Sequence, residues 1–384
     1  MQAQVVVVGA GPSGSIAARE AALMNVDVLV LEEHAQIGLP VECAGLLSLR
    51  GLKAIGAYRA RKSFILNKLR AATFYSPSGL ELRVEAPEPI ACVVDRHQLD
   101  VILAEQAMDA GAEVELGKLV KKIHVNPRGI ELKGDWGSMK GELAIIAEGF
   151  RSRLVKQLGL RGLSWRDVLP ASQVEVPTPD VDEEGVEVHL GRKVAPGFFA
   201  WVIPLGDGRS RVGLACKGVD PRTMLRFFLK RRFGLRNVKT SYSGSVLKCG
   251  PIPKTYSERA LVVGDAAGQA KPTTGGGVVL GGLCASIAGK VAAMAVKAGD
   301  FSERFLSSYE RKWKRLLGAE FSIMRKLRAL LDAMPDEVLD MAFGMARLMR
   351  LAERIPEVAD MDLQSSLLRG FLRLLIPRPG PERS

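Results

Sequence analysis

The 384-residue sequence predicts a mixed α/β fold with three parts: a parallel sheet interleaved with helices, an antiparallel sheet domain and a helical C-terminal region. Four valines at 5–8 run directly into a glycine-rich turn, which is how a βαβ unit begins. Alternating apolar and polar residues between about 155 and 245 indicate strands with one buried face. The chain that follows the second glycine-rich segment is helical in pattern.

The first glycine-rich turn has the spacing of a dinucleotide-binding fingerprint. It lies between the valine strand and an alanine-rich helix at 16–22, and the next apolar strand, 27–31, ends in Glu32. An acid about 20 residues beyond such a turn accepts hydrogen bonds from ribose hydroxyls, so Glu32 is the expected ribose ligand. The alternative is a fold of the same type that binds no nucleotide. The turn residues expected at the pyrophosphate are Gly9, Gly11, Pro12, Ser13 and Gly14.

A second glycine-rich segment narrows the nucleotide to FAD. The apolar strand 261–263 leads into Gly264 and Asp265, and a glycine run follows at 275–277. A carboxylate in this place can bind the polyol chain that flavins carry, and the glycine run lets backbone amides approach the ring. The alternative for Asp265 is a helix cap.

The composition is that of a basic globular chain. Apolar residues make up 47% and charged residues 25%, and the formal net charge is +12. A basic surface can bind nucleic acid or anionic lipid. The sequence shows no helix-turn-helix, zinc-finger or RNA-recognition pattern, so we do not expect nucleic acid binding.

Cysteine usage and the first strand bear on location. The five cysteines (Cys43, Cys92, Cys216, Cys249 and Cys284) are scattered without metal-binding spacing, so no metal site is expected. The first strand begins at Gln4, which leaves no room for a signal peptide and favours the cytoplasm. The uncharged run 272–289 has about the length of a membrane span, but it is rich in glycine and is predicted to be a buried helix.

These patterns divide the chain into three predicted regions. Residues 1–154 and 246–300 form a discontinuous FAD-binding domain, in which 46–90 contributes to the catalytic region and includes a strand pair around the turn at 76–79. Residues 155–245 form a sheet domain that covers the substrate. Residues 301–384 form a helical C-terminal region, with breaks near Pro335, Pro356 and Pro377.

Taken in order, these segments resemble the flavoproteins that share the fold of para-hydroxybenzoate hydroxylase. Within that group the chain is most similar to the geranylgeranyl reductase family, especially the archaeal digeranylgeranylglycerophospholipid reductases. The resemblance covers about residues 4–300, and the segments 40–45 and 196–204 are those that separate reductases from hydroxylases. The chain departs from the family at Phe199, where a tyrosine is common, and at Ile203, where a phenylalanine is common.

The resemblance implies further site residues. Arg96 would contact the phosphate or polyol region of the cofactor, Val120 would hold adenine through its backbone, and Cys43 would lie beside the isoalloxazine ring. The remaining implied cofactor contacts are Ala44, Gly45, Gly275, Gly276, Gly277 and Val278. The implied substrate contacts are Phe199, Trp201 and Pro204. Without the resemblance, Cys43 and the aromatic residues would be interpreted as core, and Arg96 as a solvated arginine.

The resemblance also implies an activity. A reduced flavin would saturate C=C bonds in geranylgeranyl chains of archaeal ether lipids, with Cys43 as a candidate proton donor. The alternatives are an FAD-dependent monooxygenase or epoxidase and a membrane-associated electron-transfer flavoprotein. Only one dinucleotide fingerprint is present, so we expect an external electron donor: ferredoxin, a deazaflavin and NAD(P)H all stay open.

The C-terminal region carries two features that bear on membranes. Basic residues cluster between 311 and 328, and the segment 367–376 is strongly apolar with two arginines. One interpretation is a solvated face and a helix packed on its own protein. The other is peripheral docking on the inner face of the cell membrane.

Overall fold

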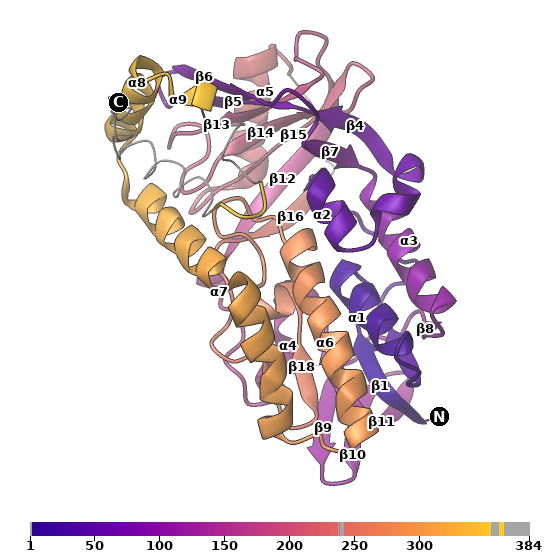
Figure 1. Ribbon diagram of the computed structural model, residues 1–384. Helices are drawn as coiled ribbons and strands as arrows, with labels where there is room; N and C mark the ends of the chain where they lie inside the picture. The colour runs from indigo at the N-terminus through magenta and orange to yellow at the C-terminus, as the bar shows by residue number, and fades with distance from the viewer. Residues whose placement is uncertain (1, 237, 239–241, 355–360, 365–384) are drawn as a thin grey trace, which may run out of the picture.

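The computed structural model describes residues 2–236, 238, 242–354 and 361–364 (Figure 1). A largely parallel sheet occupies one end of the molecule and a largely antiparallel sheet the other, and long helices run along one side (Figure 1). This arrangement confirms the predicted mixed α/β class.

The first sheet has eight strands and carries the predicted βαβ unit. Strand β1 (Gln2–Val8) lies parallel to β2 (Val28–Leu31) on one side and to β11 (Gly137–Ile146) on the other. The other strands are β8 (Glu113–Glu115), β9 (Lys122–Asn126), β10 (Gly129–Gly134), β17 (Tyr256–Ser257) and β18 (Ala260–Val262). Because parallel strands end at the same edge, the turns after β1, β2 and β18 meet there.

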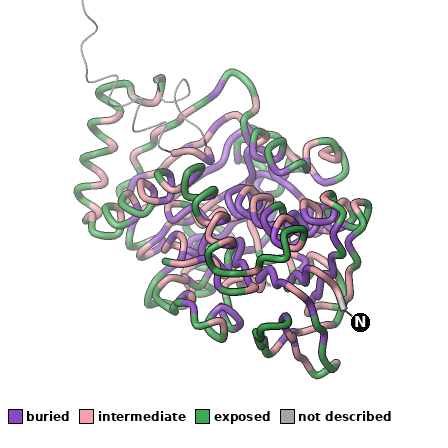
Figure 2. Tube along the Cα trace, turned by 60° about the horizontal axis from the view of Figure 1, so that its bottom comes forward, coloured by how far each residue is buried: buried purple, intermediate pink, exposed green. Residues whose placement is uncertain are grey.

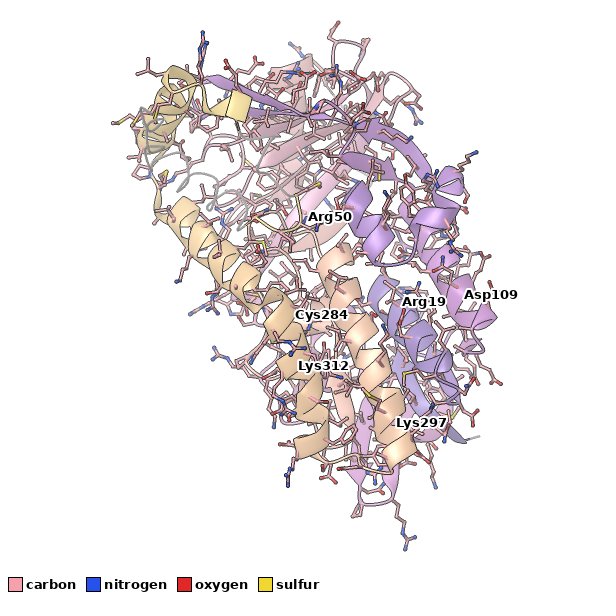
Figure 3. All side chains as sticks on the ribbon, viewed as in Figure 1. Arg19, Arg50, Asp109, Cys284, Lys297 and Lys312 are labelled. Carbon is pink, nitrogen blue, oxygen red and sulfur yellow. The ribbon has the colours of Figure 1, made fainter. Side chains whose placement is uncertain are left out.

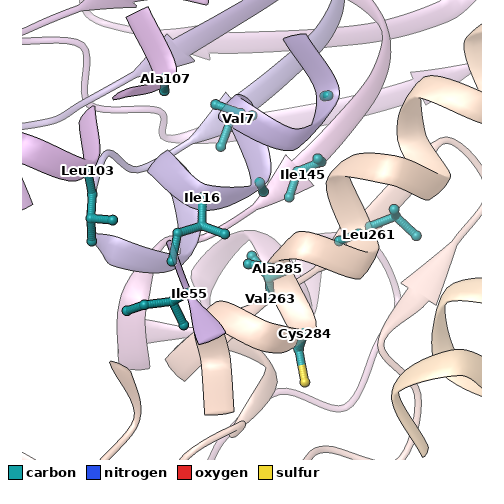
Figure 4. Packing of buried hydrophobic residues seen from close by; sticks show 14 of the residues in the cluster. Val7, Ile16, Ile55, Leu103, Ala107, Ile145, Leu261, Val263, Cys284 and Ala285 are labelled. Atoms are coloured by element: carbon teal, nitrogen blue, oxygen red, sulfur yellow. The ribbon is translucent and has the colours of Figure 1, made fainter. Parts of the chain in front are cut away.

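Three helices cover one face of this sheet: α1 (Pro12–Ala22), α6 (Val278–Ala298) and α7 (Glu303–Ala333) (Figure 1). Helix α6 packs between α1 and α7, and α3 (Arg96–Asp109) packs on the other side of α1. Their apolar side chains form the largest core of the protein, with Ile16, Leu103 and Cys284 fully buried in it (Figure 4).

Helix α6 contains most of the uncharged run noted in the sequence. It is long and apolar enough to cross a membrane, but 67% of its most apolar window is buried within the protein. The helix lies against α1 and α7, so it is a core helix, as expected.

The second sheet has seven strands in the order β16-β12-β15-β14-β13-β5-β6. Their bounds are β5 (Ala71–Tyr75), β6 (Glu81–Glu85), β12 (Val168–Pro177), β13 (Gly185–His189), β14 (Ala200–Pro204), β15 (Arg209–Ala215) and β16 (Tyr242–Leu247). All neighbouring pairs are antiparallel except β5 and β13. The predicted strand pair around the turn at 76–79 is therefore present as β5–β6, and it extends this sheet. Helix α5 (Pro221–Phe233) packs on β12 and β15.

The remaining elements connect the two sheets. A three-stranded sheet is made by β3 (Leu46–Ser48), β4 (Ile65–Leu69) and β7 (Ala91–Val94). The short helices are α2 (Leu49–Ala54), α4 (Arg153–Gln157), α8 (Asp336–Leu348) and α9 (Leu351–Arg354). Single turns of 3₁₀ helix occur at Tyr58–Ser63, Gly149–Arg151, Trp165–Asp167 and Gly264–Ala267.

The C-terminal helices begin and end largely where prolines predict. Helix α7 ends at Ala333 and α8 begins at Asp336, so the break at Pro335 is confirmed. Pro356, Pro377 and the apolar segment 367–376 lie outside the described residues.

Candidate active site

The glycine turn between β1 and α1 is closely packed on one side and open on the other. Gly9 has a φ of +103°, which a residue with a side chain rarely adopts. A Cβ atom at Gly14 would lie 1.8 Å from the carbonyl oxygen of Gly9, whereas one at Gly11 would meet no protein atom within 4 Å. No side chain of the described residues caps the N-terminus of α1. Its free amides therefore face an open space, which suits an anion such as a pyrophosphate.

Glu32 is fixed at the carboxyl end of β2, next to this turn. Its Oε2 accepts a hydrogen bond from the amide of Ala10 at 2.7 Å, and its Oε1 accepts one from the amide of His34 at 3.0 Å. The backbone of Lys118 donates to the carbonyl of Glu32, so the segment before Val120 passes beside it. Val120 itself is buried. The structure thus brings the two residues expected around the adenosine to one edge of the sheet.

The second glycine segment meets the first. A Cβ atom at Gly264 would lie only 2.4 Å from Ser13 Oγ, so the turn after β18 touches the start of α1. Asp265 follows, with its side chain exposed. A Cβ atom at Gly277 would come within 2.6 Å of Asp265 Oδ1, which places the carboxylate at the N-terminus of α6. This helix end, like that of α1, has no side-chain cap among the described residues.

Arg96 lies between Asp265 and residues 40–45, which we call the cysteine segment and which a hydrogen bond from Val94 to Gly45 holds at the start of α3. Arg96 begins α3, and its guanidinium donates to both oxygens of Asp100, at 3.0 and 3.1 Å from Nη2. Burial lowers the pKa of Arg96, but Asp100 and the adjacent Cys43 side chain outweigh that effect and raise it. Solvent reaches Asp265, but the protein atoms that surround its carboxylate still desolvate it and raise its pKa, and the charge of Arg96 opposes this rise. The cation therefore lies within electrostatic reach of both Cys43 and Asp265.

Arg211, which no sequence pattern indicated, holds the cysteine segment from the other sheet. This buried side chain on β15 donates from Nη1 to the carbonyls of Ala44 and Val94, each at 3.1 Å, and from Nε to Glu175 at 2.8 Å. Gly45 must be a glycine because a Cβ atom there would lie 2.6 Å from that guanidinium. An arginine inside an alternating strand is ordinarily interpreted as solvent-facing, which is why the pattern missed it.

A second contact that the sequence did not indicate ties the far C-terminal chain to the glycine run. The ammonium group of Lys271 pairs with Asp362 at 2.9 Å, and both side chains are buried. Asp362 also accepts a hydrogen bond from Ser48, which caps α2. The backbone of Lys271 bonds with Gly275 and Gly276, so this ion pair supports the turn that leads into α6.

Two of the predicted substrate residues, Phe199 and Trp201, form an apolar wall on β14 and the segment before it. Phe199 stacks on Phe198 with ring centroids 4.3 Å apart and meets Trp201 edge-on at 6.1 Å. Trp201 donates from its indole nitrogen to Gln173, and it packs against the buried cluster that Ala44 also contacts. We call Phe198, Phe199 and Trp201 the aromatic wall.

Pro204 does not join the aromatic wall. It is buried, and strand alternation places it on the same face as Val202, which packs under α5, and opposite to Trp201. This geometry argues against the substrate contact predicted for Pro204.

A recess elsewhere on the surface holds none of these residues. It has a volume of about 620 Å³ and lies between α1 and α3, where Arg19, Lys53 and Asp109 line it. Figure 3 labels Arg19 and Asp109. The chemistry-bearing residues converge instead where the two glycine turns, the cysteine segment and the aromatic wall approach one another.

Comparison with known proteins decides the family. Residues 2–222 match the FAD binding domain family. The chain is 37% identical to digeranylgeranylglycerophospholipid reductase 2 of Methanothermobacter thermautotrophicus, over 88% of this chain and 90% of that protein. It is 31% identical to digeranylgeranylglycerophospholipid reductase of Methanocaldococcus jannaschii, over 95% and 94%. The chain belongs to this reductase family.

Solved structures agree on the fold. A geranylgeranyl bacteriochlorophyll reductase-like protein of Thermoplasma acidophilum superposes with a TM-score of 0.85 at 25% identity, covering 96% of each chain. A p-nitrophenol 4-monooxygenase of Pseudomonas putida gives a TM-score of 0.71 at 18% identity, over 98% of this chain and 100% of that one. The predicted para-hydroxybenzoate-hydroxylase-like arrangement is therefore confirmed.

The reductase is an FAD-dependent oxidoreductase, and its residues fit the cofactor. Two uncapped helix N-termini, the open side of Gly11 and the exposed carboxylate of Asp265 lie around one space. Pyrophosphate suits the first helix end, polyol hydroxyls suit Asp265, and the positive end of α6 favours negative charge on the flavin ring. The individual contacts stay predictions.

Asp265→Asn should lower the affinity for FAD about tenfold, because the neutral amide is a weaker acceptor for the polyol hydroxyls. Asp265→Ala should lower it further. Titration of the apoprotein with FAD, followed by flavin fluorescence, measures both. Asp300→Asn, on an exposed loop, is the control. Unchanged affinity in both Asp265 variants would remove the assignment.

Proposed function

We propose that this reductase saturates C=C bonds of geranylgeranyl chains in archaeal ether phospholipids. The observation that carries the proposal is that the segments meet. Gly45, next to Cys43 and Ala44, accepts a hydrogen bond from Val94 at 2.8 Å, and the charge of Arg96 acts on both Cys43 and Asp265. A Cβ atom at Gly275 would lie 2.3 Å from Val246, which packs on the same cluster as Phe199 and Trp201. The relatives of the chain are named for this lipid. Bound FAD in its reduced form supplies the hydride for the alkene.

The residues of the chain position the prenyl group and donate a proton to its double bond. An isolated alkene has no carbonyl to take up charge, so it needs a proton donor aligned with the hydride donor across one double bond. Cys43 is the proposed donor, and the carbonyl of Ala44, held by Arg211, fixes the segment that carries it. The aromatic wall supplies an apolar surface for the prenyl chain and excludes water.

The proposal also includes an external electron donor and contact with the membrane. Electrons come from ferredoxin, a deazaflavin or NAD(P)H, and the lipid is met at the cytoplasmic face of the membrane. The basic residues Arg311, Lys312, Lys314 and Arg315 are exposed on α7, where Figure 3 labels Lys312. Their exposure fits both a solvated face and contact with anionic lipid.

Product analysis tests the proposed reaction. The protein, reduced with dithionite under anaerobic conditions, is incubated with an unsaturated archaeal phospholipid, and the lipids are examined by mass spectrometry. A gain of two hydrogens per double bond is expected. Oxygen consumption with hydroxylated or epoxidised lipid would favour the monooxygenase alternative, to which the fold alone is related. Reoxidation of the flavin with unchanged lipid would favour electron transfer.

Trp201→Ala should reduce kcat/KM for a geranylgeranyl chain about tenfold more than for a short prenyl chain, because apolar contact accumulates with chain length. Competition between the two chain lengths measures the ratio directly. Trp165→Ala removes a tryptophan that is 78% exposed and serves as the control. Equal losses for both lengths would point to a disturbed flavin environment instead.

A further inference from the structure

Helix α8 presents an apolar stripe to solvent. Its members recur three or four residues apart and thus share one face of the helix. They are Val338, Met341, Met345, Leu348 and Met349, with exposures of 43%, 67%, 60%, 86% and 49%. We call these five residues the α8 stripe. Near the end of α7, Leu330 is also exposed, at 56%.

The opposite face of α8 is fastened to the protein by polar groups. Asp340 accepts hydrogen bonds from the amide and hydroxyl of Ser78, at 3.0 and 2.7 Å, in the turn between β5 and β6. Asp336 accepts one from the amide of Arg192 at 3.1 Å. The hydrogen bond from Ser76 lowers the pKa of Asp340, so this carboxylate is charged at neutral pH. The helix cannot turn the stripe inward without breaking these contacts.

An outward apolar stripe of this kind needs a partner. The helix packs on β6, the edge strand of the sheet that carries the aromatic wall, at the corner of the molecule marked C in Figure 1. Figure 2 shows buried residues concentrated inside the molecule and exposed residues along its outline. Contiguous apolar side chains on a surface mark a site of contact with protein or membrane.

The charges around the stripe indicate which partner. The stripe contains no charged residue, and exposed cations outnumber exposed acids around it. Arg347 and Arg350 lie with Glu353 at one end of α8, where Arg350 pairs with Glu353 at 3.8 Å. Arg192 and Lys193 lie with Glu337 at the other end. Cations flanking an apolar helical face are typical of helices that lie in the interface of an anionic membrane. At their observed exposures, the five side chains of the α8 stripe offer less surface area than the roughly 800 Å² that each partner of a standard protein–protein interface buries. The area therefore favours a membrane over a protein partner.

We propose that the α8 stripe docks on the surface of an anionic lipid bilayer, with its apolar side chains among the acyl chains and the flanking arginines at the head groups. This rests on the proposed function, because the substrate is then a lipid of that bilayer. Docking at α8 places β6, the edge strand of the seven-stranded sheet that carries the aromatic wall, next to the membrane. The surface is separate from the basic residues 311–315 on α7.

The double variant Met341→Asp/Met345→Asp tests the proposal. Binding to vesicles of equal parts phosphatidylglycerol and phosphatidylcholine, measured by flotation, should weaken about tenfold or more, because two apolar side chains no longer enter the lipid. The matched control is Leu23→Asp/Leu116→Asp, which adds the same charges at sites that are 61% and 42% exposed. These lie at the ends of α1 and β8, remote from α8 in Figure 1. The control should bind as the parent does.

Three results would overturn the proposal. The first is parent-like vesicle binding by the stripe variant, with loss in Leu372→Asp/Leu375→Asp instead. The second is an equal loss in the stripe variant and the control, which would reflect charge alone. The third is a parent that is dimeric by light scattering and a stripe variant that is monomeric, with vesicle binding unchanged.

An activity assay on detergent-dispersed lipid separates this proposal from the proposed function. The stripe variant should match the parent there, since α8 holds no part of the candidate active site. A parent inactive on dispersed lipid would count against the reductase function, while the vesicle result would still decide the docking surface.

Discussion

Gly11→Ala should keep the fold and lose FAD, whereas Gly14→Ala should damage both. At Gly11 the φ of −65° suits any residue and a methyl group meets no protein atom within 4 Å, so stability should change by less than about 0.5 kcal/mol. The cofactor pyrophosphate needs that same space, so the FAD dissociation constant should rise about 100-fold, or about 2.7 kcal/mol. At Gly14 the methyl group would lie 1.8 Å from the Gly9 carbonyl oxygen, which costs about 3 kcal/mol or more.

Thermal unfolding of the apoproteins and FAD titration measure the two effects separately. Gly344→Ala is a control for the substitution itself, since nothing lies within 4 Å of that position and it is remote from the site. Parent-like FAD affinity in Gly11→Ala would show that the pyrophosphate does not approach this turn. An apoprotein of Gly14→Ala as stable as the parent would mean that α1 can move away from the turn.

The nucleotide-binding part of the fold could be predicted because each of its elements has its own local sequence pattern. The valine strand, the glycine turn and Glu32 lie within one βαβ unit, and their contacts follow from its geometry. Asp265 was predicted from the turn after a second buried strand, and the structure places it at the N-terminus of α6. The structure supports these placements, although each cofactor contact remains to be measured.

Contacts between distant segments could not be predicted in this way. Arg211 reaches the cysteine segment only because β15 and the three-stranded sheet face each other, and no spacing in the sequence encodes that. Asp362 pairs with Lys271 across a separation of 91 residues. The resemblance implied Pro204 and Trp201 together as substrate contacts, but strand alternation separates their faces.

The family resemblance supplied what spacing could not. A cysteine between a proline and a glycine is ordinarily a small buried residue. The structure gives Cys43 an intermediate exposure, an amide donor from Gly45 at 3.4 Å and a guanidinium beside it. These contacts place the thiol at the candidate site, and its role in the chemistry is a question for mutation.

Cys43→Ser should fold, bind FAD with the parent's affinity and hydrogenate the prenyl chain about 100-fold more slowly. The thiol lies beside Arg96, outside the two glycine turns that are predicted to bind the cofactor, so its replacement should leave binding intact. A hydroxyl is a far weaker acid than a thiol, and loss of a positioned general acid costs about 100-fold or more in rate. The rate of flavin reoxidation by lipid in a single anaerobic turnover measures the chemical step directly.

Cys249→Ser is the matched control for this variant. Burial and the charge of Asp167 raise the pKa of the Cys249 thiol to about 12, and its Sγ donates to the Gly250 carbonyl at 3.1 Å. The charge of Asp265 also acts on the Cys249 thiol, but no guanidinium lies beside this thiol among the described contacts. The control variant should therefore keep the parent's turnover rate. Parent-like turnover in Cys43→Ser would leave the thiol a packing role only, and an ordered water would then be the proton donor. Loss of flavin from the same variant would instead make Cys43 part of the cofactor cradle, because a change confined to the proton donor leaves FAD affinity untouched.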